Sequence, residues 1–176
     1  MNHPAGRMAR TRKPLFMPPP PILDLATLDC GSVLHSREEI YSFLPQRHEM
    51  SQLDGIIHVD RANMIMAGYR DVRPDEWWCR GHMPGSPIFP GVLMMETAAQ
   101  LAAFAQHIFV PLPGAIMGFG GIDGAKFRGA VIPPARIILV NKAVDPRPRK
   151  FICATQAYVD GAMVFEGVIA GIQLKL

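Results

Sequence analysis

Residues 92–109 read VLMMETAAQLAAFAQHIF and, with Val110, form the longest run of the chain without proline or glycine. Apolar side chains occur all round this predicted helix, and Glu96 is the only Asp, Glu, Lys or Arg between Arg80 and Asp123. A helix at the surface carries one apolar stripe, so a helix that is apolar on every side is predicted to be enclosed by the rest of the fold.

The segments on either side of the helix have the character of strands. Residues 53–59 and 62–72 precede it and meet at a predicted turn at Asp60-Arg61. Four segments rich in Val, Ile, Ala and Phe follow it: 115–122, 136–145, 150–159 and 162–175, with Asp160-Gly161 as a hairpin turn. We therefore predict an α+β fold in which a curved antiparallel β-sheet wraps a long buried helix. A small α/β domain is the alternative, but the strand–helix alternation that it needs is missing.

The N-terminal part differs in composition from the rest. Residues 1–23 hold four Lys and Arg, no acid and six of the 17 prolines. The whole chain carries 18 Lys and Arg against 15 Asp and Glu, so the remainder carries 14 against 15, a net charge of −1. We predict a flexible, proline-rich basic extension over residues 1–30 and a single domain over 31–176. A nucleic-acid-binding arm or an organelle transit peptide are the alternatives for the extension, while the domain itself is not basic enough to indicate a nucleic-acid partner.

Other classes of protein are excluded by simple patterns. No window approaches eighteen consecutive apolar residues without a charge or a proline, so no membrane span is predicted. Cys30, Cys79 and Cys153 are odd in number and widely spaced, which argues against a disulfide framework or a zinc site and favours a reducing cytoplasm.

Before the domain core, Ser36 is expected to cap a short helix that Pro45 ends.

The chemistry is expected at residues 81–100. Residues 81–91 read GHMPGSPIFPG, and three prolines and three glycines in that run specify a rigid, non-helical loop. His82 is the only titratable side chain in the loop, which makes it a candidate general base. Glu96 is costly to bury unless it is paired or functional, and Gln100, one turn further, shares its face of the helix. The unpaired N–H groups at Gly91 favour an anion or a polarised carbonyl oxygen.

That arrangement suits proton abstraction next to a carbonyl. His82 would take the proton, the helix N-terminus at Gly91 would stabilise the enolate oxygen, and Glu96 would exchange a proton with a substituent one carbon further away. From the residues alone, a hydrogen-bonded loop histidine and a glutamate paired elsewhere remain as alternatives.

The stretch GHMPGSPIFPGVLMMETAAQ resembles the signature of the (3R)-hydroxyacyl-[acyl carrier protein] dehydratases of the FabZ type, which have the hotdog fold. The resemblance extends over residues 40–174. It includes Leu44-Pro45-Gln46-Arg47 with Asp54, the stretch 121–128, and Val159-Asp160-Gly161.

The resemblance implies roles for particular residues. His82 falls on the family's catalytic histidine, Glu96 on its catalytic acid, and the Gly91 N–H on its oxyanion donor. It also implies a homodimer whose two active sites each combine the histidine of one subunit with the glutamate of the other, and often a hexamer of three dimers. Isomerising relatives carry aspartate at the acid position, so glutamate favours dehydration alone. The implied substrate is a hydroxyacyl chain on the phosphopantetheine of an acyl carrier protein, with no metal and no bound cofactor.

A local basic stretch suits an acidic carrier. Residues 126–150 hold seven Lys and Arg against Asp145 alone. We predict that Lys126, Arg128 and Arg136 contribute to carrier binding, with ordinary solvated cations as the alternative. The sequence departs from the family's pattern at Met83, at 48–52 and at 133–136. The resemblance therefore does not define the length of the acyl chain or the way in which the carrier is bound. The rival functions are a hotdog acyl thioesterase and a non-catalytic acyl-binding protein.

Overall fold

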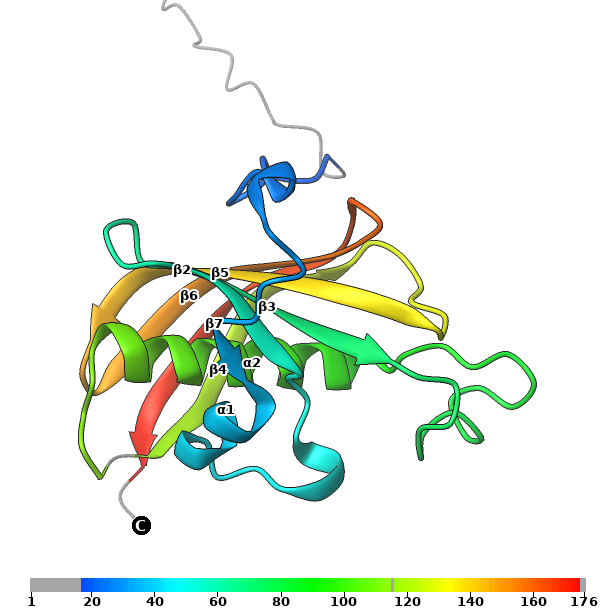
Figure 1. Cartoon of the computed structure of the whole chain (residues 1–176), viewed down its shortest axis with the longest axis horizontal. Coiled ribbons are helices and arrows are strands. Elements are labelled where there is room, and N and C mark those ends of the chain that lie inside the picture. The colour runs from blue at the N-terminus through cyan, green and yellow to red at the C-terminus, as the bar shows by residue number, and fades with distance from the viewer. Residues whose placement is uncertain (1–16, 115, 175–176) are drawn as a thin grey trace, which may run out of the picture.

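The predicted central helix is α2 (Gly91–Phe109), which lies across the concave face of one curved sheet (Figure 1). The computed structural model describes residues 17–114 and 116–174. Side chains from several sides of α2 are buried in the main core, among them Leu93, Met94, Ala98, Leu101 and Phe104. Most of the helix is thus enclosed as predicted, whereas the side that carries Val92, Met95, Ala99 and Ala103 is half-buried or exposed in the single chain.

Seven strands form the sheet, and every neighbouring pair is antiparallel. They are β1 (His35–Ser36), β2 (Gly55–Asp60), β3 (Ile65–Val72), β4 (Ile116–Phe127), β5 (Ala135–Arg147), β6 (Lys150–Val159) and β7 (Ala162–Leu174). Their order across the sheet is β1-β2-β3-β5-β6-β7-β4, so β4 is an edge strand. The predicted α+β hotdog arrangement is confirmed.

The hairpin turn at Asp160-Gly161 is confirmed, whereas the turn between β2 and β3 lies at residues 61–64 instead of Asp60-Arg61, and one strand is longer than predicted. Asp160 and Gly161 join β6 to β7 with φ values of 49° and 78°, as a tight hairpin turn requires. Strand β4 continues to Phe127 instead of ending near residue 122. Its pairing with β7 shifts register twice, and Gly124 adopts a φ of 61° within the second shift. These bulges let a glycine-rich segment stay in the sheet.

The short helix α1 (Arg37–Phe43) begins where the capping serine was predicted. Ser36 Oγ accepts a hydrogen bond from the Glu39 N–H at 3.3 Å, and Leu44 ends the helix before Pro45. Ile40 and Tyr41 are buried against α2 and its surroundings. A 3-10 turn, η2 (His48–Met50), follows and leads the chain into β2.

Part of the predicted N-terminal extension packs on the convex face of the sheet. The Ile22 N–H donates to Gln156 Oε1 at 2.7 Å, and Gln156 Nε2 donates to the Pro20 carbonyl at 3.0 Å. Ile22, Leu23, Leu25 and Leu28, around the 3-10 turn η1 (Leu25–Thr27), cover a second apolar cluster that includes Val140 and Tyr158. Residues 1–16 of the predicted flexible extension lie outside the described residues. The domain boundary near residue 30 stays a prediction.

The three cysteines are free, and Cys153 on β6 is fully buried. Burial raises the pKa of the Cys153 thiol to about 12, whereas an exposed thiol titrates near 9.0. The unfolded chain therefore loses this proton first, and the free energy of unfolding should fall as the pH rises from 9 toward 12, by about 2–3 kcal/mol at pH 11. Urea unfolding at neutral and alkaline pH measures this loss. Tyr41, whose pKa burial also raises to about 12, adds its own loss in this range, so Cys153→Ala should make the loss smaller by about 2–3 kcal/mol at pH 11 and the exposed-site control Cys30→Ala should leave it unchanged. An equal loss in all three proteins would contradict the prediction.

Within the described part of the chain, no helix is long and apolar enough to cross a membrane.

Candidate active site

The loop that carries His82 joins β3 to α2 and extends beyond the end of the sheet (Figure 1). Hydrogen bonds hold it in shape: His82 N–H to the Trp78 carbonyl at 2.8 Å, and Ile88 N–H to the His82 carbonyl at 2.9 Å. Trp78 and Phe89 are each 3% exposed and pack edge to face with ring centroids 5.5 Å apart. The loop is therefore anchored in the core on both sides of the histidine.

The ring of His82 is held in one tautomer. Its Nδ1 lies 2.8 Å from the Ile88 carbonyl oxygen. A carbonyl oxygen only accepts hydrogen bonds, so Nδ1 carries the hydrogen and Nε2 of the neutral ring carries the free lone pair. Nε2 is thus the atom available to remove a proton from a substrate.

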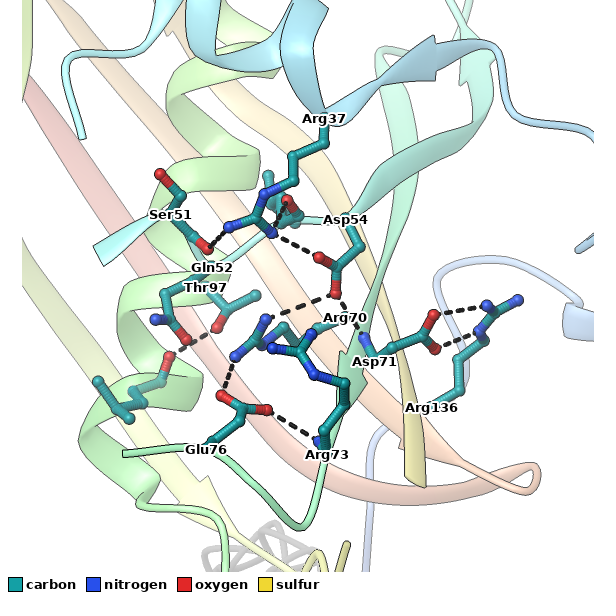
Figure 2. A network of polar contacts seen from close by, with 12 residues as sticks. Arg37, Ser51, Gln52, Asp54, Arg70, Asp71, Arg73, Glu76, Thr97 and Arg136 are labelled. Atoms are coloured by element: carbon teal, nitrogen blue, oxygen red, sulfur yellow. Dashed lines mark hydrogen bonds and ion pairs between the residues drawn. The ribbon is translucent and has the colours of Figure 1, made fainter. Parts of the chain in front are cut away.

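A network of ion pairs fastens the base of this loop to the sheet (Figure 2). Arg70 of β3 is 4% exposed and pairs with Glu76 of the loop and with Asp54 Oδ2, the latter at 3.5 Å. Glu76 also accepts hydrogen bonds from Arg73 N–H at 2.8 Å and Trp78 Nε1 at 3.2 Å. Because Trp78 bonds directly to the backbone of His82, this network sets where the histidine lies.

The second carboxylate oxygen of Asp54, Oδ1, is held by a residue of helix α1. Arg37 pairs with Asp54 Oδ1 and donates to the Ser51 carbonyl at 2.7 Å. The sequence identified Asp54 only through the family resemblance and did not identify Arg37, Arg70 or Glu76, because residues so far apart in the chain show no spacing signal.

The first turn of α2 offers free backbone donors. Leu93 N–H and Met94 N–H bond to the Pro90 carbonyl at 2.9 and 3.1 Å. Within the described residues, the N–H groups of Gly91 and Val92 have no protein acceptor. A Cβ at position 91 would lie 2.8 Å from Phe127 Cε1, so glycine keeps this turn close to the edge strand β4. The geometry suits the predicted oxyanion contact at Gly91.

Glu96 lies on the wall of a narrow cavity with about 40 Å³ of free space. The other residues of the wall come from α2, β4, β6 and β7 and from Gln46, and none of them is charged: Ala99, Ala102, Ala103, Met117, Gly118, Phe119, Phe151, Ile169, Ala170 and Gly171. His82 is not among the described residues that line this cavity. The structure of one chain therefore does not bring the predicted base and the predicted acid into a common cavity.

The carboxylate of Glu96 is oriented by two amides. Its Oε1 accepts a hydrogen bond from Gln100 Nε2 at 2.7 Å and a longer one from Gln46 Nε2 at 3.4 Å. Gln100 was predicted to share a helix face with Glu96, and it does so; its role in the reaction stays a prediction. Gln46 was identified in the sequence only as part of the Leu44–Arg47 segment of the resemblance.

The three cations predicted to bind a carrier all have acidic neighbours. Lys126 and Arg128 both pair with Glu166, and the Lys126 Nζ to Glu166 Oε1 distance is 3.7 Å. Arg136 makes a two-point pair with Asp71 at 2.6 and 2.7 Å and lies over the Tyr69 ring. The Arg128 side chain is 14% exposed, whereas those of Lys126 and Arg136 are 54% and 44% exposed. In the described residues no group of three or more His, Cys, Asp or Glu is placed to hold a metal ion.

Comparisons with known proteins identify the family and agree with the fold. A family model described as a FabA-like domain matches residues 44–168. The 3-hydroxyacyl-[acyl-carrier-protein] dehydratase FabZ of Sorangium cellulosum is 35% identical over 131 residues, which are 73% of this chain and 84% of that protein. The FabZ of Fusobacterium nucleatum is 35% identical over 129 residues, 73% of this chain and 89% of that protein.

Among solved structures, the dehydratase heterocomplex ApeI:P from Xenorhabdus doucetiae superposes with a TM-score of 0.65 at 13% identity, over 77% of this chain and 91% of that one, which is a likeness of fold. The family match over most of the domain and the identity with two FabZ proteins lead to one conclusion: the chain belongs to the FabA-like family, among the FabZ-type hotdog dehydratases.

Proposed function

We propose that this protein removes water from (3R)-hydroxyacyl-[acyl carrier protein] thioesters and forms trans-2-enoyl thioesters, in the synthesis of fatty acids or of related lipids or polyketides. Membership of the FabZ-type family supports the reaction class. The observation that carries the assignment of roles is the tautomer of His82, because its Nδ1 bond to Ile88 leaves Nε2 as a base.

In the proposed reaction, His82 Nε2 takes a proton from C2 of the acyl chain. The electrons of that C–H bond move toward the thioester carbonyl, whose oxygen accepts hydrogen bonds from the N–H groups at Gly91 and Val92. Glu96 gives its proton to the C3 hydroxyl, the C3–O bond breaks, and water leaves as the C2–C3 double bond forms. His82 ends protonated and Glu96 ends as a carboxylate; proton exchange with solvent restores both.

The site is proposed to be completed by a second copy of the chain. Strand β4 ends the sheet, and exposed apolar side chains gather on β4 and its neighbour β7: Phe119, Phe127, Val168, Ile172 and Leu174. A long apolar edge strand in a soluble protein needs a cover, and pairing of β4 with its copy about a two-fold axis supplies one. The separation of His82 from the cavity of Glu96 supports sites that combine His82 of one subunit with Glu96 of the other. Assembly of three such dimers into a hexamer stays a prediction.

The cavity beside Glu96 suits an acyl chain. Its wall is built mostly of alanine, glycine and aliphatic or aromatic side chains, with the carboxylate as its only charge. We expect the length of the acyl chain that the cavity accepts to depend on how far its walls move apart. Segments 48–52 and 133–136, where the sequence departs from the family pattern, are expected to change that length or the binding of the carrier protein. The reaction as written needs no metal and no cofactor beyond the phosphopantetheine of the substrate.

The proposed activity is tested with a 3-hydroxyacyl thioester of acyl carrier protein, following enoyl product and free thiol in the same sample. Dehydration without thiol release is the expected result. Thiol release without enoyl product would indicate a thioesterase, and binding with neither product would indicate a non-catalytic acyl-binding protein. A series of acyl lengths in the same assay defines the substrate class.

Carrier binding through Lys126 and Arg136 is tested by charge reversal. Lys126→Glu and Arg136→Glu should raise the KM for the carrier-bound substrate by about tenfold together, because each reversal replaces attraction to an acidic partner by repulsion. The KM for a small N-acetylcysteamine thioester should stay unchanged. Arg128→Glu is a poor test on its own, because the Arg128 side chain is only 14% exposed and a glutamate there would be held against Glu166, whereas the side chains at 126 and 136 are 54% and 44% exposed and can turn into solvent. An unchanged KM for the carrier substrate in the double variant would contradict this role.

A further inference from the structure

The side-chain amide of Gln100 is fully hydrogen-bonded in the interior, where the residue is 1% exposed. Its Oε1 accepts from the Tyr41 hydroxyl at 2.6 Å and from the Gln52 N–H at 3.0 Å. Its Nε2 donates to the Met50 carbonyl and to Glu96 Oε1, both at 2.7 Å. Both lone pairs and both N–H groups of the amide are therefore used.

The partners of this amide leave it one orientation. The Gln52 N–H only donates and the Met50 carbonyl only accepts, so the oxygen faces Gln52 and the nitrogen faces Met50. The Leu53 N–H donates to the Tyr41 hydroxyl oxygen at 2.7 Å, which leaves the hydroxyl hydrogen for the Gln100 oxygen. Burial raises the pKa of the Tyr41 hydroxyl to about 12, so this hydrogen is present throughout the neutral range.

We propose that Tyr41 is a positioning residue for the dehydration: acting through Gln100, it keeps an N–H donor on Glu96 Oε1 and so places the transferable proton on Oε2. This inference rests on the proposed function, in which Glu96 is the acid. Oε1 accepts from both Gln100 Nε2 and Gln46 Nε2, which suits the carbonyl oxygen of a carboxyl group and leaves Oε2 as the oxygen that carries the proton. The arrangement presents the Glu96 proton in one place before the substrate arrives.

The parts of this relay come from segments that lie far from Gln100 in the sequence. Tyr41 belongs to α1, and the backbone groups of Met50, Gln52 and Leu53 belong to the segment around η2, where the sequence departs from the apolar run of the family it resembles. Helix α1 is thereby linked to the acid on α2 by two hydrogen bonds in series, from Tyr41 to Gln100 and from Gln100 to Glu96. In the sequence, a tyrosine at this spacing on a short amphipathic helix is typical of a core residue, which is why Tyr41 was not identified there.

Tyr41→Phe tests the proposal, because it removes the hydroxyl and keeps the ring. In the carrier-thioester assay we expect kcat to fall by about tenfold, as loss of one hydrogen bond at the reacting group allows, with little change in KM. Tyr158→Phe is the matched control. The Tyr158 hydroxyl also donates to a glutamine Oε1 at 2.6 Å, but it does so to Gln156 on the convex face of the sheet. That control should lower the melting temperature comparably and leave kcat unchanged.

A double-mutant cycle with Gln100→Ala separates positioning from general destabilisation. If Tyr41 acts through Gln100, then Tyr41→Phe should have no further effect on kcat once Gln100 is alanine. Additive losses of kcat in the double variant, or a Tyr41→Phe protein with the wild-type kcat, would overturn the proposal while the dehydratase assignment stands. A wild-type protein that forms no enoyl product would instead overturn the proposed function, and this inference with it.

Discussion

His82→Ala should reduce kcat for enoyl formation by about 10³-fold, within the range that one general base contributes. The variant keeps the loop, the helix N-terminus and the acid, and loses only the atom that removes the C2 proton. Glu96→Gln should have a comparable effect, because the amide keeps the shape of the side chain and cannot give a proton to the departing hydroxyl. Both are measured with the carrier-bound hydroxyacyl thioester under single-turnover conditions, so that product release does not hide the chemical step.

The control for these variants is His35→Ala, a histidine on β1 that pairs with Glu39 at 2.7 Å and lies outside the site. It should keep kcat within about twofold of the wild type, since His35 packs on Phe104 and contacts neither the His82 loop nor Glu96. The assignment of roles would be contradicted by His82→Ala or Glu96→Gln retaining most of the wild-type rate with an unchanged melting temperature.

Arg70→Met should cost about 3–5 kcal/mol in the free energy of unfolding, the largest stability effect expected of any substitution considered. The Arg70 and Glu76 side chains are 4% and 5% exposed, and Asp54 is 15% exposed, so removing the guanidinium leaves two carboxylates with little access to water. The loss should also lower kcat, because Glu76 and Trp78 hold the base of the His82 loop. Urea unfolding of the wild type and the variant at neutral pH gives the first quantity.

Arg136→Met is the matched control for Arg70→Met. It breaks a two-point pair with Asp71, but both side chains are more than 40% exposed, so the expected loss is below about 1 kcal/mol. Equal losses for the two variants would show that burial does not decide the cost, and a loss under 1 kcal/mol for Arg70→Met would contradict the view that this network anchors the loop.

Local patterns in the sequence predicted most of the fold. The run at 92–109 predicted α2 to within one residue at its start, because it holds no proline or glycine and follows directly on Pro90-Gly91. The serine before α1 and the Asp160-Gly161 turn were also predicted, since each is a local choice of backbone conformation. The extension of β4 through its glycines was not, because the pairing with β7 that stabilises it is formed between distant segments.

The site was predictable only in part, for the same reason. His82, Gly91, Glu96 and Gln100 lie within twenty residues, and their spacing on one loop and one helix can be derived from the chain alone. Tyr41 and the Arg70 network depend on contacts that the fold creates between segments, such as the 59 residues that separate Tyr41 from Gln100. In the proposed dimer, the residues that complete the site across the β4 edge belong to a second copy of the chain, so contacts within one chain do not include them.

The most direct test of a shared active site is the activity of a mixed protein made from His82→Ala and Glu96→Gln subunits. If each site combines His82 of one subunit with Glu96 of the other, a mixed dimer keeps one intact site and one doubly altered site. Equal co-expression with random pairing should then restore about a quarter of the wild-type kcat per dimer, from two variants that are nearly inactive alone. A mixture no more active than its parents, although both subunits are shown to be in one particle, would contradict the account.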